Sequence, residues 1–168
     1  MNTQEIMHQI DIQLRTLMHI RAMFPTMGSN MIGQTNAIPP PFYQMHGFRI
    51  ELRFEKPLTD EQINVMNNIG RWVNQSFIIR LCALLESYHI IPPKGHGHIN
   101  KQFDGHEAID IIRRLRDVFA HTSGRYNPNK RRENKLYRRI IESYSINAED
   151  PSTASEFSVP IDTLNRKL

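Results

Sequence analysis

The sequence predicts a mainly α-helical protein: a four-to-five-helix up-down bundle with one short β element at about residues 48–55. Apolar residues recur every three or four positions in four long segments, which is typical of amphipathic helices. Strict alternation of apolar and charged residues is found in one segment, and proline and glycine separate the segments. A chain of 168 residues can bury a core without disulfides. We therefore expect a single domain over 1–168, with its core at about 60–145.

The first helix is expected over residues 4–24, where isoleucine, leucine and methionine have helical spacing. Four prolines and three glycines then predict a long loop over residues 25–47. Residues 48–55 alternate apolar and charged side chains without a break, which predicts a half-buried strand. Two partners are possible for this strand. One is residues 157–161, where Pro160 restricts pairing to an edge, and the other is a second copy of the strand in a dimer.

Three further helices follow. Thr59 and Gln62 have the spacing of a capping box, which predicts the start of a long helix that ends before Pro92. The next helix is expected over residues 106–121, with an inward face that comprises Ala108, Ile111, Ile112, Leu115 and Phe119. A basic helix over 131–146 is expected to bury Leu136, Ile140 and Tyr144. Residues 147–168 are expected to be loosely structured.

The charge is distributed unevenly along the chain. Residues 1–90 carry seven basic and seven acidic side chains, a net charge of zero. Residues 113–139 carry ten basic and two acidic side chains, a net charge of +8, and the last 29 residues have a net charge of −3. One basic block of this kind is typical of a protein that binds the phosphate backbone of a nucleic acid. A solvated helical face, or pairing with the acidic tail, is the alternative.

Other features exclude several classes of protein. Cys82 is the only cysteine, so no intrachain disulfide forms and a cytoplasmic location is expected. The sequence has no secretory signal and no run of apolar residues long enough to span a membrane. His96 and His98 have no carboxylate or cysteine at ligand spacing on a regular element, so no metal or cofactor is expected. Cys82 is expected to be a small buried side chain.

The hexapeptide Arg116-Asp117-Val118-Phe119-Ala120-His121 ends the helix predicted over 106–121, beside the basic block. A guanidinium stabilises negative charge at phosphorus, and an imidazole transfers protons near neutral pH, so Arg116 and His121 together suit chemistry on a phosphodiester. The alternative is structural: an arginine paired with Asp117 or Glu86, and a histidine bonded to a carbonyl at the helix end.

These residues resemble the HEPN superfamily, whose helical bundles present an Arg-x4-His motif at the end of a core helix. The similarity covers about residues 60–145 and includes the segments Trp72–Phe77 and Leu84–Tyr88. It implies a metal-independent endoribonuclease of toxin or phage-defence type that acts on RNA as a homodimer, with an antitoxin or other defence-system protein as a further partner. A non-catalytic HEPN module that binds RNA, a nucleotide or a protein as a scaffold is the alternative.

The resemblance implies that Arg116 and His121 are catalytic. Asp117 stands where asparagine is more usual and is expected to orient the histidine. Glu86, Ser123 and Tyr126 are expected to support the site. The RNA-binding residues are expected to be Arg113, Arg114, Arg125, Lys130, Arg131 and Arg132.

The geometry of a helix limits how Arg116 and His121 can meet. Each residue of an α-helix turns ~100°, so positions 116 and 121 lie ~140° apart around a straight helix. The two side chains face one substrate only if the helix ends before His121, which Thr122-Ser123-Gly124 favours, or if two chains share the site.

Overall fold

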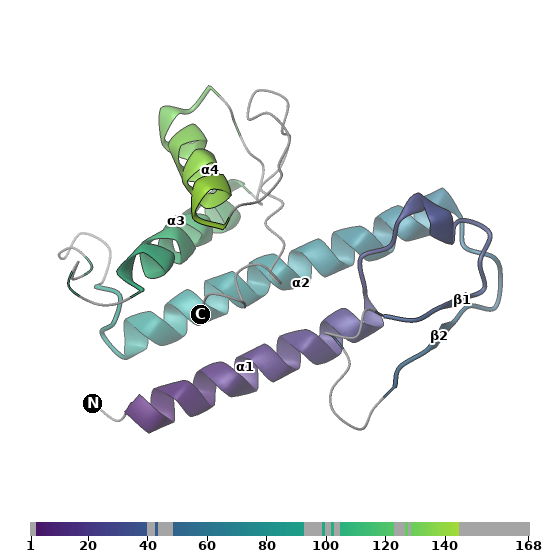
Figure 1. Ribbon diagram of the computed structural model, residues 1–168, viewed down its shortest axis with the longest axis horizontal. Helices are drawn as coiled ribbons and strands as arrows, with labels where there is room; N and C mark the ends of the chain where they lie inside the picture. The colour runs from purple at the N-terminus through teal and green to yellow at the C-terminus, as the bar shows by residue number, and fades with distance from the viewer. Residues whose placement is uncertain are drawn as a thin grey trace. The chain divides into compact units, whose positions relative to one another are not determined.

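The computed structural model describes residues 3–39, 43, 49–92, 99, 102, 105–122, 127 and 129–144. These residues form four α-helices and a two-stranded antiparallel sheet, which confirms the predicted mainly helical class with one short β element (Figure 1). The chain divides into two compact units, residues 1–77 and residues 78–168. The single domain predicted over the whole chain stays a prediction. None of the described helices combines the length and the apolar character that a membrane span requires.

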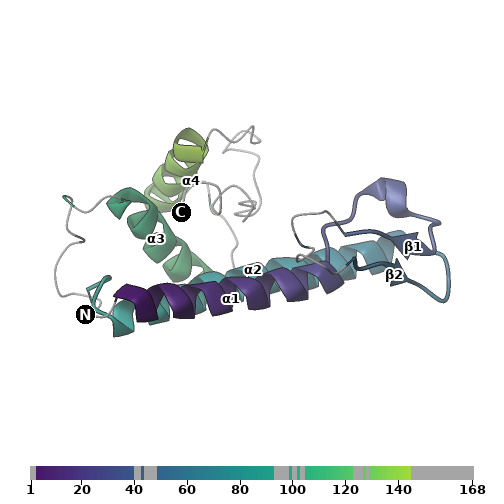
Figure 2. The same ribbon diagram turned by 60° about the horizontal axis from the view of Figure 1, so that its bottom comes forward.

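In the first unit, helix α1 (Thr3–Met23) lies beside the first part of helix α2 (Asp60–Ser87). The two run in opposite directions, as Figures 1 and 2 both show. The periodic segment predicted as a helix over 4–24 is therefore helical. Leu17 and Ala22 of α1 and Ile63 of α2 are among the buried side chains of this unit.

The predicted strand is much shorter than expected. Of the described residues in this segment, only Leu52–Arg53 (β2) forms regular pairs. Its partner is Asn36–Ala37 (β1), in antiparallel register with Asn36 opposite Arg53 and Ala37 opposite Leu52. The described partner thus comes from the segment predicted to be a loop over 25–47, which also contains a short 3-10 helix (Ser29–Met31). The predicted alternative partner, residues 157–161, lies outside the described residues.

Packing explains why this partner is chosen. Ala37 is buried in a cluster with Met27, Leu58 and Ile63, and Leu52 and Phe54 pack against the same cluster. Gln34 accepts a hydrogen bond from the Leu58 N–H at 2.9 Å, and Leu58 accepts one from the Gly33 N–H at 2.8 Å. A two-residue strand has no detectable alternation, so the sequence pattern could not reveal it.

Arg21 of α1 is a buried cation within the first unit, only 3% exposed. Its Nη2 donates to the Thr26 hydroxyl at 2.7 Å and, with Nε, to the Tyr43 hydroxyl at 3.2 and 3.3 Å. The guanidinium carbon also lies 5.3 Å from the centre of the Tyr43 ring. The guanidinium packs against Gly70 of α2, so closely that a Cβ added at Gly70 would collide with Arg21 Nη1. A glycine inside a long helix is unfavourable by itself, so this close contact explains why glycine is found at position 70.

The ends of α2 are held by local hydrogen bonds. The predicted capping box is present, since the Thr59 N–H donates to Gln62 Oε1 at 2.9 Å and the Gln62 N–H donates to Thr59 Oγ1 at 3.2 Å. At the other end, His89 has a positive φ of 58°, and the Ile90 N–H donates to the Leu85 carbonyl at 2.9 Å. This left-handed residue ends α2 before Pro92, two residues after Ser87.

The second unit consists of the end of α2, helix α3 (His106–Thr122) and helix α4 (Arg131–Tyr144). Its core is formed by apolar side chains from all three segments: Ile78, Leu81, Cys82, Leu85, Ile111, Ile112, Leu115, Leu136 and Ile140. The predicted inward face of α3 is partly correct. Ala108 and Phe119 are only half-buried, whereas Ile109 and Val118 are buried. The side chain of Tyr144 and the tail over 147–168 lie outside the described residues.

Candidate catalytic site at the end of helix α3

Arg116 and His121 both lie on α3, but in different surroundings. Arg116 is half-buried, whereas His121 is exposed in the last helical turn. The helix predicted over 106–121 is confirmed to within one residue, because α3 continues through Thr122, so Arg116 and His121 are not brought together by an early end of the helix. The ~140° separation expected for a regular helix therefore applies within one chain.

Two carboxylates hold the Arg116 guanidinium. Its Nη2 lies 2.9 Å from Glu86 Oε1, at the end of α2, and its Nε lies 3.0 Å from Asp117 Oδ1. The second contact is an ion pair by distance only, since Nε is buried and makes no hydrogen bond. The pair with Glu86 joins two helices of the same unit. The pairing expected from the structural alternative is thus present, and Glu86 does reach Arg116.

Cys82 of α2 lies close enough to this ion pair for the charges of Arg116 and Glu86 to act on its thiol. Its Sγ donates to the Ile112 carbonyl at 3.5 Å, and the side chain is completely buried. Burial raises the pKa of the Cys82 thiol to about 12, although the nearby Arg116 lowers it. The thiol is therefore protonated at neutral pH and unsuited to act as a nucleophile. It fills space between α2 and α3.

Part of the basic block is neutralised internally. Asp110 of α3 accepts hydrogen bonds from Arg113 at 3.0 Å, Arg114 at 2.9 Å and Arg139 of α4 at 2.6 Å. Burial raises the pKa of Asp110, but the hydrogen bonds from Arg139 and Arg114 outweigh this effect and lower it to about 2. Of the expected RNA-binding residues, Arg113 and Arg114 are thus engaged with a carboxylate of their own helix.

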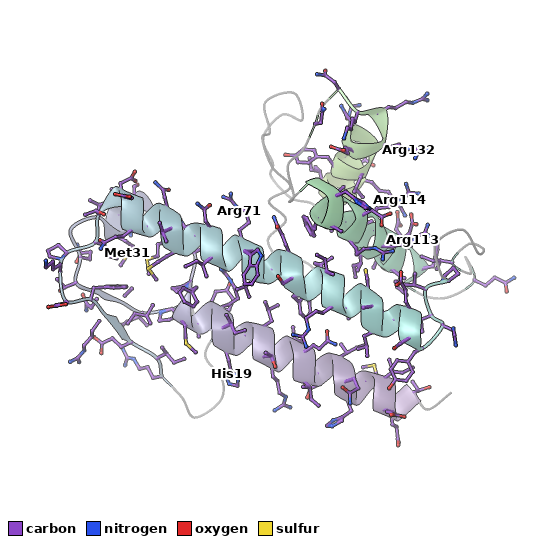
Figure 3. All side chains as sticks on the ribbon, turned by 180° about the vertical axis from the view of Figure 1, so that it is seen from behind. His19, Met31, Arg71, Arg113, Arg114 and Arg132 are labelled. Atoms are coloured by element: carbon purple, nitrogen blue, oxygen red, sulfur yellow. The ribbon has the colours of Figure 1, made fainter. Side chains whose placement is uncertain are left out.

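Other cations of the block extend into solvent on α4. Lys130 lies 3.2 Å from Glu133, which also accepts the Asn127 N–H at 2.8 Å. Four exposed cations of α4 have no carboxylate within ion-pair distance in the described part of the chain: Arg131, Arg132, Lys135 and Arg138. We call these four residues the α4 basic face. Figure 3 labels Arg132 on α4, and Arg113 and Arg114 on α3.

The candidate residues of the site are thus only partly brought together. Arg116, Asp117 and Glu86 are in contact, whereas His121 is not joined to them by any described interaction. Ser123, Arg125 and Tyr126 lie outside the described residues. Lys135 and Arg138 were not selected from the sequence, although their spacing from Arg131 places all three on one side of a helix. Among the described residues, no group of three or more histidine, cysteine, aspartate or glutamate side chains is arranged to hold a metal ion.

Comparison with known proteins adds no relative. No family model, no curated protein and no solved structure matches the chain.

The arrangement provides a fixed positive charge beside an exposed proton carrier. The guanidinium of Arg116 is held by Glu86, so its position is fixed before any ligand binds. An imidazole exposed at the helix end can reach a second molecule without displacing core residues. Because the two side chains point in different directions on one helix, a single substrate would contact both only where two copies meet.

Proposed function

We propose that the chain is a metal-independent endoribonuclease of toxin or phage-defence type, which acts as a homodimer at an Arg116–His121 site shared between two copies. His121 takes the proton from the 2′-hydroxyl of RNA, whose oxygen then attacks the adjacent phosphorus. The bond from phosphorus to the 5′-oxygen breaks, and that oxygen receives a proton from the imidazolium of His121. Arg116 stabilises the negative charge of the transition state.

One observation carries this proposal: an arginine preorganised by a carboxylate lies five positions before an exposed histidine, in the same unit as the α4 basic face. Preorganised charge is the largest contribution to many enzymatic rates. The α4 basic face supplies cations for the phosphates that flank the cleaved bond. The similarity to HEPN domains is consistent with each of these roles.

The test is cleavage of RNA by the purified chain in the presence of EDTA. We expect products that end in a 2′,3′-cyclic phosphate and a 5′-hydroxyl, because the 2′-oxygen is the nucleophile and no metal takes part. Loss of cleavage on chelation, or products with a 3′-hydroxyl, would contradict the mechanism.

A second function is favoured by the two carboxylates around Arg116. A guanidinium that is already paired on two sides has less capacity to stabilise a phosphorane, and Asp117 adds negative charge where phosphate would bind. These contacts favour a scaffold that binds RNA without cleaving it. Tight, salt-sensitive binding of RNA with no cleavage by the intact dimer would support this alternative.

Both functions predict that the α4 basic face binds the RNA backbone. Replacing Arg131 and Arg132 with glutamine is expected to weaken binding of single-stranded RNA and to reduce the slope of log affinity against log salt by about 1.4. Sequence preference should not change, since phosphates carry no sequence information. The measurement is a salt titration of affinity by fluorescence anisotropy.

The matched control removes two exposed cations from the other unit, Arg15 and Lys56. This variant has the same net charge as the α4 double variant and is expected to retain the parental slope. Equal losses from both variants would mean that net charge, and not the α4 basic face, determines binding.

A further inference from the structure

We propose that two copies of this chain pair edge to edge through residues 49–55, as antiparallel strands centred on Leu52. The result is a continuous sheet of four strands, in the order β1, β2, β2 and β1. This inference goes beyond the proposed function. It concerns the first unit alone and requires neither RNA nor the Arg116–His121 site.

The segment has the shape of a strand beyond its two paired residues. Exposure alternates at every position from 49 to 55, with odd-numbered side chains exposed and even-numbered ones half-buried. This is the pleat of an extended chain. Leu52 and Phe54 pack against the core cluster of this unit, so one face is fixed to the protein. The opposite face carries only charged side chains: Arg49, Glu51, Arg53 and Glu55.

The hydrogen bonds to β1 determine which edge is free. The Phe54 N–H donates to the Thr35 carbonyl at 2.8 Å, one step along from the pair Asn36–Arg53. In an antiparallel ladder, alternate residues direct both backbone polar groups toward the partner strand. The even-numbered residues therefore face β1, and Glu51 and Arg53 direct theirs away from it. Among the described residues, no further backbone hydrogen bond engages that outer edge.

The charges on this edge are self-complementary. Glu51 and Arg53 lie on one face, where Arg53 Nη2 is 3.4 Å from Glu51 Oε2 within the chain. When two antiparallel copies are centred on Leu52, Glu51 of each copy lies opposite Arg53 of the other. Arg49 likewise lies opposite Glu55, so four pairs of opposite charge form.

Other registers are disfavoured by the same residues. A shift of two residues in one direction places Glu51 opposite Glu51, and a shift in the other direction places Arg53 opposite Arg53. A shift of one residue turns the charged face of one copy toward the apolar face of the other. In the centred register, Leu52 meets Leu52 and Ile50 meets Phe54, which extends the apolar face across the two-fold axis. A second copy is therefore the occupant that this edge matches.

The first test is a charge swap, read by analytical ultracentrifugation at several protein concentrations. Glu51→Arg places like charges opposite each other at two symmetric positions, so we expect the dimer dissociation constant to rise roughly tenfold or more. Arg53→Glu should do the same. The double variant Glu51→Arg/Arg53→Glu restores opposite charges at both positions and is expected to dimerise like the parent.

The second test is oxidative cross-linking. Leu52→Cys places a thiol on the two-fold axis, at a non-hydrogen-bonded position where the two Cα atoms lie ~4.5 Å apart, within the range that a disulfide bridges. Ile50→Cys is the matched control on the same half-buried face, where the two thiols of a dimer would lie ~13 Å apart. Native Cys82 can be kept, because it is buried and its thiol stays protonated.

We expect Leu52→Cys, and not Ile50→Cys, to form a covalent dimer. A monomeric parent, a single charge reversal that leaves the dissociation constant unchanged, or equal cross-linking of both cysteine variants would overturn the proposal. If Leu52→Cys does not fold, the charge swap on exposed residues still tests the proposed interface. A monomeric parent would also contradict the dimer of the proposed function, whereas the charge variants and the cysteine variants test this interface alone. RNA cleavage is a separate measurement, so a dimer that forms through this interface without cleaving RNA would contradict only the proposed function.

Discussion

His121→Ala is expected to lower the rate of RNA cleavage about 10²–10⁴-fold, because it removes the group that moves the proton. Arg116→Ala is expected to lower it about 10²–10³-fold through loss of a preorganised charge. Both variants should remain folded, since His121 is exposed and Arg116 is half-buried beside a carboxylate that water can reach. The measurement is single-turnover cleavage with EDTA present, together with thermal unfolding of each variant.

The controls remove the same chemical groups elsewhere. His19 and Arg15 are exposed on α1, and Figure 3 labels His19. Alanine at either position is expected to leave the cleavage rate unchanged. An equal loss from His19→Ala and His121→Ala would show that the activity does not belong to the proposed site.

A mixed dimer tests whether the site is shared. If Arg116 of one copy acts with His121 of the other, a heterodimer of Arg116→Ala and His121→Ala subunits keeps one intact site and loses the other. Random assembly then restores about a quarter of the parental activity, because half of the dimers are mixed. A site within one chain predicts no restoration, since neither subunit has both residues.

The helices could be predicted well from the sequence because each has a long periodic pattern. The helix predicted over 4–24 is α1, and the capping box of Thr59 and Gln62 makes both of its hydrogen bonds. The helix predicted over 106–121 is α3, whose last residue is Thr122. A difference of one residue at a helix end is within the usual uncertainty of a helix boundary.

Contacts between distant residues could not be predicted in the same way. Glu86 and Arg116 are 30 positions apart on different helices, so no spacing rule joins them, although Glu86 was chosen as a supporting residue. The pairing of β2 with Asn36–Ala37 is equally invisible, because two residues have no period. Asp110 accepts hydrogen bonds from Arg113 and Arg114, which the sequence assigned to RNA, and from Arg139. A nearby carboxylate can thus pair with cations that a charge pattern assigns to a ligand.

The buried arginine was also missed, since charged residues on an amphipathic helix are expected to be exposed. Gly70 was the available signal. A glycine in the interior of a 28-residue helix lowers helix stability, so a close contact is a common reason for its presence.

Gly70→Ala is therefore expected to lower the free energy of unfolding by roughly 1–3 kcal/mol, the range for loss of hydrogen bonds to a charged group. Without the contact to Arg21, replacing glycine with alanine would stabilise the helix interior by about 1 kcal/mol. The sign of the change in the free energy of unfolding therefore shows whether the contact is present. The added Cβ would lie 2.9 Å from Arg21 Cζ and 3.1 Å from the Phe24 carbonyl oxygen, and still closer to Arg21 Nη1. The guanidinium must then leave Thr26 and Tyr43, its only hydrogen-bond partners among the described residues.

A double-mutant cycle with Arg21→Leu isolates this effect. Arg21→Leu destabilises by itself because it deprives the Thr26 and Tyr43 hydroxyls of the guanidinium. In that background Gly70→Ala is expected to be close to neutral, since the colliding atoms are gone and only the Phe24 carbonyl remains near. Urea unfolding of the four proteins gives the coupling energy, with Asn68→Ala on the exposed side of α2 as the control for helix propensity. If Gly70→Ala costs the same with and without Arg21, packing against the guanidinium is not the reason for glycine at this position.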